Sequence, residues 1–287
     1  LLAAYADAEP RLVVLDGDLA DSDGAHHFAV RHPDRFVMAG IAEQSMVSVA
    51  AGMAEAGRRP WVFSFAAFLC YRAYDQIRVC LSQARQPVVL VGSHAGGLSG
   101  RNGKSHAAVN DLALMLSLPG MQVWSPADRD DTRLAVRTLL ATQDPSYLRC
   151  PRTPIEDDLP GEARPMRWLT PRAPVVIVST GIASHWALAA ARLVGAGQVG
   201  VLHVARLRPL PDLAGELREA RRVFVVEDHA TFGGLASLVH RLGLRLPITA
   251  LGWPDDYAGQ SGGDDQLRAA HGLSAEQLAR TIARDEE

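Results

Sequence analysis

Short apolar runs recur along the chain and predict a succession of buried strands. In the first half the runs are 12–15 (LVVL), 36–39 (FVMA), 61–65 (WVFSF) and 87–92 (PVVLVG). In the second half they are 175–180 (VVIVST), 199–204 (VGVLHV) and 223–228 (VFVVED). Helical segments, such as 183–194, lie between them. Continuous apolar strands that alternate with helices are typical of a mostly parallel α/β sheet covered on both faces.

The spacing of these elements predicts two domains. Prolines and charges accumulate between the two sets of strands without any periodicity, as they do in linkers. We therefore expect a first domain over residues 1–154, a linker over 155–172 and a second domain over 173–287. A length of 287 residues is sufficient for two cores, each a mostly parallel sheet flanked by helices.

One carboxyl group stands out from this pattern. The run 36–39 ends at Gly40, and the predicted helix 41–54 that follows is small or apolar on nearly every side, which indicates a buried helix. Glu43 lies in its first turn, where the only polar neighbours in sequence are Gln44 and Ser45. The carboxylate either complements the positive end of the helix dipole or, because burial disfavours its ionised form, donates a proton near neutral pH.

Composition narrows the functional classes. A hydrophobic share of 48%, a charged share of 21% and a net charge of -3 describe an ordinary globular protein without the basic surface of nucleic-acid binders. Three cysteines without a CxxC pair favour a reducing, cytoplasmic setting. No apolar run reaches the roughly 20 residues of a membrane-spanning helix. The sequence starts at Leu1 without an initiator methionine, so we expect further residues to precede it.

Three segments, GIAEQ, FSFAAFLCYRAYDQIR and GSHAGGLSGRNGKSH, resemble in order and spacing the pyrimidine-binding domain of transketolases and deoxyxylulose phosphate synthases. The later run DHATFGGLASLV resembles their C-terminal domain. The resemblance implies that Glu43 contacts the pyrimidine ring nitrogen of thiamine diphosphate, where proton exchange activates the cofactor. It also implies that Phe65, Phe68 and Tyr71 wall the pyrimidine pocket, although their spacing alone would indicate core packing.

The same resemblance implies a set of substrate-binding residues. His94 and His106 match histidines that hydrogen-bond sugar hydroxyls and stabilise charge on the substrate oxygen. Ser22 matches a serine that contacts a substrate phosphate. Arg149 matches an arginine that holds this phosphate, with Arg152 as a nearby alternative, since the planar guanidinium can bind two oxygens at once. Without the resemblance, an arginine at a domain edge would simply be solvated.

Two departures from the family shape the predicted function. Asn102 stands where transketolases commonly carry an acidic residue that recognises the donor, so donor specificity stays open. The GDG motif and downstream asparagine that mark the site for magnesium and diphosphate are absent from the sequence. The chain therefore resembles the C-terminal subunit of a split transketolase, active only with an N-terminal partner subunit that holds Mg²⁺ and the diphosphate, in an expected α2β2 assembly.

The implied reaction moves a two-carbon ketol unit from a ketose donor to an acceptor. The acceptor is an aldose or, as in some split enzymes, a lipoyl or acyl-carrier arm. The alternatives are a deoxyxylulose phosphate synthase-like carboligase, the β component of a 2-oxoacid dehydrogenase, and a non-catalytic structural subunit. The presence of Glu43, the three aromatic residues and both histidines argues against a non-catalytic subunit.

Overall fold

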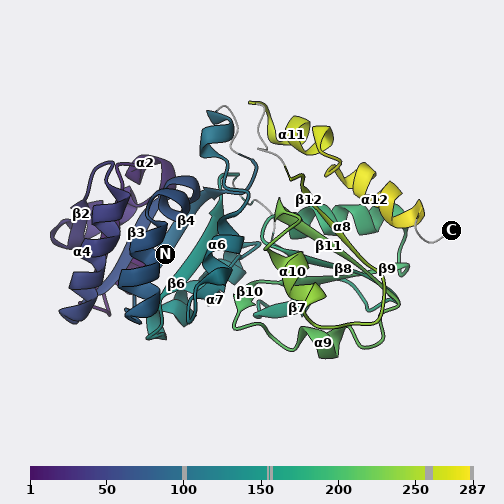
Figure 1. Cartoon of the computed structure of the whole chain (residues 1–287), viewed down its shortest axis with the longest axis horizontal. Helices are drawn as coiled ribbons and strands as arrows, with labels where there is room; N and C mark the ends of the chain where they lie inside the picture. Colours follow the sequence, from purple (N-terminus) through teal and green to yellow (C-terminus); the bar gives the residue numbers. More distant parts are fainter. Residues whose placement is uncertain (99–101, 154, 156–157, 256–260, 285–287) are drawn as a thin grey trace.

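The computed structural model describes residues 1–98, 102–153, 155, 158–255 and 261–284. Two sheets lie side by side, one built mainly from the first half of the chain and the other from the second half (Figure 1). Helices cover both faces of each sheet. The fold class predicted from the sequence, two mostly parallel sheets flanked by helices, is confirmed.

The first sheet has the strand order β10-β5-β6-β4-β3-β1-β2. Its strands are β1 (Leu12–Asp16), β2 (Phe36–Met38), β3 (Arg59–Phe65), β4 (Val89–Ala95), β5 (Gln122–Trp124), β6 (Ser146–Pro151) and β10 (Arg206–Arg208). All neighbours pair in parallel except β10, which runs antiparallel to β5. Since β10 comes from the second half of the chain, the first sheet is completed by a strand that the sequence did not predict there.

Alternation along the strands divides the first core into two layers. In β1, Val13 and Leu15 face the core that includes α4 and α6, whereas Leu12 and Val14 face the core that includes α3 and α7. The α-helices of this half are α1 (Leu2–Tyr5), α2 (Ala20–Asp23), α3 (His26–Arg31), α4 (Glu43–Glu55), α5 (Tyr74–Gln76), α6 (Asp111–Ser117) and α7 (Arg129–Ala141). Shorter elements are the π-helical segments η2 (Phe68–Arg72) and η3 (Ile77–Gln83) and the 3-10 turns η1 (Pro33–Arg35) and η5 (Lys104–His106).

The second sheet has the order β12-β11-β8-β9-β7. Its strands are β7 (Met166–Trp168), β8 (Val175–Thr180), β9 (Val199–Val204), β11 (Arg222–Ala230) and β12 (Ile248–Trp253). Its helices are α8 (Ala183–Val194), α9 (Leu213–Glu216), α10 (Leu235–His240), α11 (Asp264–Ala270) and α12 (Ala275–Arg284). The antiparallel strand β7 lies inside the predicted linker 155–172. The domain boundaries themselves stay a prediction.

Helix α4 differs from the buried helix that the sequence predicts. Its apolar stripe packs on the sheet and consists of Met46, Val47, Ala50 and Ala54. The opposite face, with Ser45, Ser48, Val49 and Gly52, is exposed, and the Val49 side chain is 48% exposed. The expectation of burial on every side was therefore wrong for the single chain, because small residues on a helix do not by themselves require a covering element.

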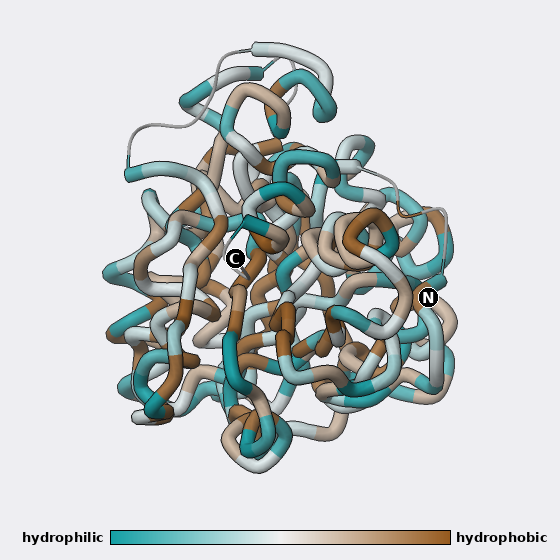
Figure 2. Tube along the Cα trace, turned by 90° about the vertical axis from the view of Figure 1, so that its right-hand side faces the viewer, coloured by the Kyte–Doolittle hydropathy of each residue, from teal (hydrophilic) through white to brown (hydrophobic). Residues whose placement is uncertain are grey.

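Hydropathy follows the arrangement of the layers. Brown, hydrophobic stretches run through the middle of the trace, and teal segments lie toward its rim (Figure 2). Across the described part of the chain, no helix combines the length and the apolar character needed to cross a membrane.

Candidate active site

Glu43 lies at the carboxyl edge of the first sheet, because α4 starts shortly after β2 ends. Its side chain is fully buried. Oε2 is 2.5 Å from Nη1 of Arg72, and the Ser64 hydroxyl donates to Oε1 at 3.5 Å. Gln44 and Ser45, the neighbours considered from sequence, are exposed. Glu43 is thus a fully buried side chain whose charge partner is Arg72.

Two aromatic residues and two histidines cluster at the same edge. Phe65, at the end of β3, stacks on Phe68 of η2 with ring centroids 5.9 Å apart. His94 stacks on Phe65 at 3.9 Å, and His106 meets Phe68 edge-on at 5.1 Å. The sequence placed these four residues on two separate segments, 63–78 and 92–106, and the fold brings them into one group.

The electrostatics of His94 favour a neutral imidazole. Partial burial lowers its pKa to about 4, and the positive charges of Arg152 and His106 act in the same direction. His94 also adopts a positive φ of 53°, which is uncommon for a non-glycine residue and frequent at functional sites. At neutral pH this ring can donate and accept hydrogen bonds without carrying charge.

The remaining predicted residues of the pocket are less enclosed. Tyr71 is 44% exposed, and its hydroxyl accepts a hydrogen bond from the backbone amide of Asn110 at 3.2 Å. Partial burial raises the pKa of Tyr71 to about 12, so the phenol stays protonated. Ser22 is exposed on α2, just after β1. Asn102 is exposed on the loop before His106. Residues 99–101 of the segment GSHAGGLSGRNGKSH lie outside the described residues.

Arg149, the residue predicted to hold the substrate phosphate, does not line an open site. Its side chain is 2% exposed and donates to both oxygens of Asp111, at 2.8 and 3.2 Å, and to the backbone carbonyl of Asp228 at 2.6 Å. A buried guanidinium that is engaged in this way cannot reach a substrate phosphate. Arg149 lies inside β6, whose residues 146–149 are all buried.

Arg152 is better placed than Arg149 to meet a ligand. It is exposed just beyond the end of β6 and lines a cavity of about 860 Å³ together with Thr153 and residues 261–266. A side-chain carbon on Gly103 would lie 3.1 Å from the hydroxyl of Ser261, so the loop before His106 runs beside this cavity. Arg152, the alternative predicted from the sequence, is therefore exposed beside a cavity, whereas Arg149 is buried.

Gly96 and Gly97, which follow β4, pack against the second half of the chain. A side-chain carbon on Gly96 would overlap the Asp228 carboxylate, and one on Gly97 would overlap the Trp253 ring. The Gly97 amide donates to Oδ1 of Asp228 at 3.0 Å. Buried His229 accepts a hydrogen bond from the Ala113 amide at 3.2 Å. These two glycines are thus required by packing against the second half of the chain.

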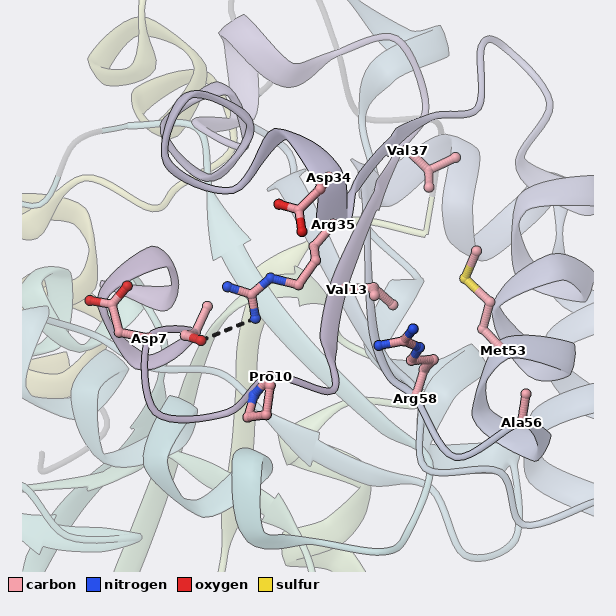
Figure 3. Close-up of a pocket in the computed structure, with 10 residues that line it drawn as sticks. Asp7, Pro10, Val13, Asp34, Arg35, Val37, Met53, Ala56 and Arg58 are labelled. Carbon is pink, nitrogen blue, oxygen red and sulfur yellow. Dashed lines mark hydrogen bonds between the residues drawn. The ribbon is translucent and has the colours of Figure 1, made fainter.

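A second cavity, of about 680 Å³, lies at the other end of the first sheet (Figure 3). It is lined by Val13, Val37 and Met53 together with Arg35 and Arg58. It opens near the amino ends of β1 and β2, whereas ligands of parallel sheets bind outside the carboxyl ends. We therefore place the candidate site at the Glu43 edge.

Among residues 1–98, 102–153, 155, 158–255 and 261–284, no group of three or more His, Cys, Asp or Glu side chains is arranged to hold a metal ion.

Two family models match the chain. The pyrimidine-binding domain of transketolase matches residues 1–156, and the C-terminal domain of transketolase matches residues 166–278.

Individual relatives cover almost the whole chain. A 6-deoxy-6-sulfo-D-fructose transketolase subunit, SqwH, from a Clostridium species is 34% identical, over 98% of this chain and 90% of its own length. Transketolase of Homo sapiens is 33% identical over 98% of this chain, but the chain spans only 47% of that protein. A solved structure titled split gene transketolase, inactive beta4 tetramer, has a TM-score of 0.85 and 32% identity, over 99% of this chain and 94% of that one.

Proposed function

The chain belongs to the transketolase family, in which it corresponds to the C-terminal subunit of a split enzyme, and on that premise we propose that it is the pyrimidine-binding half of a two-component, thiamine diphosphate-dependent transketolase. The proposed reaction transfers a two-carbon ketol unit from a ketose donor to an acceptor. One observation carries the proposal: the fully buried Glu43 carboxylate lies at the carboxyl edge of the sheet, where Phe65 and Phe68 stack.

The Glu43 carboxyl and the stacked rings of Phe65 and Phe68 fit an aminopyrimidine ring. A carboxyl group can share a proton with a ring nitrogen, and the flat heterocycle gains from stacking on aromatic faces. Burial of Glu43 keeps water away from that proton, so it can move between the carboxyl and the ring. When bound, thiamine diphosphate supplies the carbon nucleophile and electron sink that side chains lack.

His94 and His106 are proposed to bind the sugar. Both rings meet the Phe65 and Phe68 pair, so they lie beside the proposed pyrimidine position. His94 is neutral at physiological pH and can donate to a hydroxyl or to the donor's carbonyl oxygen as negative charge develops there.

Phosphate recognition is assigned to residues around the 860 Å³ cavity. Arg152 is exposed there and has the planar donor geometry that suits phosphate. Ser22, exposed after β1, and Asn102, exposed before His106, are proposed to complete donor recognition. Asn102 offers an amide where the family commonly has a carboxylate, so we expect a donor preference that differs from that of full-length transketolases.

The proposed partner is an N-terminal transketolase subunit that holds the diphosphate and Mg²⁺ in an α2β2 assembly. Two findings support it. The chain spans about half of a full-length transketolase, and α4, which carries Glu43, exposes the face of Ser45, Ser48, Val49 and Gly52. Small side chains on a helix allow close approach of another helix, so this face suits contact with another subunit.

Calorimetry with thiamine diphosphate and Mg²⁺ tests the proposal. We expect weak or no binding to the lone chain, tight binding once the partner is added, and ketol transfer from a ketose phosphate only by the mixture. The partner alone is the control for sites on that subunit. Micromolar binding by the lone chain would contradict the two-component arrangement, and an assembled complex that binds no cofactor would contradict the function as a whole.

A further inference from the structure

Arg72 makes two contacts at the proposed pyrimidine position. Its Nη1 is 2.5 Å from Oε2 of Glu43, and its guanidinium carbon lies 4.8 Å from the centroid of the Phe68 ring. Arg72 is the last residue of the π-helical segment η2, a type of element that is frequent at functional sites. The sequence analysis gave this arginine no role.

These contacts are the same two that the proposed function assigns to the cofactor. The guanidinium is a flat group whose N–H bonds point at a carboxylate while its face covers an aromatic ring. An aminopyrimidine bound at this site would need the Glu43 carboxyl and the Phe68 face for itself. With Arg72 in place the Glu43 side chain is 0% exposed, so a ring cannot reach the carboxyl unless the arginine moves.

Resting on the proposed function, we propose that Arg72 occupies the pyrimidine subsite of the cofactor-free chain and must leave Glu43 before thiamine diphosphate can bind. The ion pair supplies a counter-ion to a carboxylate that would otherwise be buried alone. Departure of the arginine is feasible because its side chain is already 43% exposed and can extend into solvent. Arg72 is thus a residue that sets the affinity for the cofactor through Glu43.

Cofactor affinity of an Arg72→Met variant, assembled with the partner subunit, tests this inference. Methionine keeps much of the apolar stem and removes the charge that pairs with Glu43. Because the competitor is gone, we expect the Kd for thiamine diphosphate at saturating Mg²⁺ to fall by about two- to fivefold, the size expected for a partly exposed ion pair. Arg78→Met is the matched control, since Arg78 is exposed and pairs with exposed Asp75, and its Kd should equal that of the wild type.

A second measurement needs no cofactor. In the lone chain Arg72→Met leaves the Glu43 carboxylate without its counter-ion, so the melting temperature should fall, and adding Glu43→Gln should restore part of the loss. If Arg72→Met does not fold, Arg72→Gln takes its place in both experiments.

The outcomes separate this inference from the proposed function. If the wild-type complex binds no thiamine diphosphate, the function fails. If the wild type binds and the Arg72 variants bind equally well or more weakly, the inference is overturned, because the arginine then does not compete with the cofactor.

Discussion

An Arg149→Met variant tests whether Arg149 stabilises the fold or binds the substrate. The guanidinium is almost fully buried, and it neutralises Asp111, whose carboxylate is also fully buried. Its removal leaves that carboxylate without a charge partner and the backbone carbonyl of Asp228 without a donor. Breaking one side of a buried ion pair typically destabilises a protein by about 3–5 kcal/mol. We expect a loss of this size in the free energy of unfolding of Arg149→Met.

Denaturant unfolding of the lone chain measures the effect, and Arg152→Met is the matched control. Arg152 is exposed, so its substitution should change the free energy of unfolding by no more than about 0.5 kcal/mol. In the assembled enzyme the same control should raise KM for a phosphorylated donor more than for its unphosphorylated analogue, because only the former uses the guanidinium.

The two variants together can refute the assignment. If Arg149→Met unfolds like the wild type and selectively weakens the phosphorylated donor, then Arg149 is the phosphate ligand, and the ion pair with Asp111 is not a structural requirement.

Two further predictions concern the site itself. Glu43→Gln should reduce turnover of the assembled enzyme on the order of 100- to 10,000-fold, because the amide cannot exchange the proton; a loss of only about 0.3–1 kcal/mol of stability with normal turnover would instead indicate a helix-end role. His94 has a pKa lowered from 6.5 to about 4 in the folded chain. Its contribution to stability is therefore present above pH 6.5 and lost as pH falls toward 4, so the difference in unfolding free energy between wild type and His94→Asn should change only within that window.

The local pattern of apolar and polar residues predicted most of the fold. Strands such as β1 and β9 and the helix α8 were placed from sequence because their apolar runs must be buried wherever they lie. Asp128 is the N-cap of α7, a position that aspartate favours, and its side chain accepts a hydrogen bond from the Asp131 backbone amide at 2.7 Å. Such signals act over a few residues and are therefore visible in a single sequence.

Contacts between distant segments were not predictable in the same way. Arg72 is 29 residues from Glu43, and Arg149 is 38 residues from Asp111 and 79 from Asp228. The charge of each arginine was evident, but its partner depends on the order of strands in the sheet. The transfer of β10 to the first sheet was missed for a related reason, since three residues of strand carry no signal of which edge they join.

The second half of the chain acts on the site through packing. Its Asp228 accepts hydrogen bonds from the Gly97 amide and from the Trp253 indole at 2.6 Å, and it also lies beside Arg149. Gly96 and Gly97, which lie between His94 and His106 in sequence, are therefore packed against buried side chains of the second sheet. The second half of the chain can thus fix the backbone just after His94, because Gly96 and Gly97 have no room to shift unless Asp228 and Trp253 shift with them.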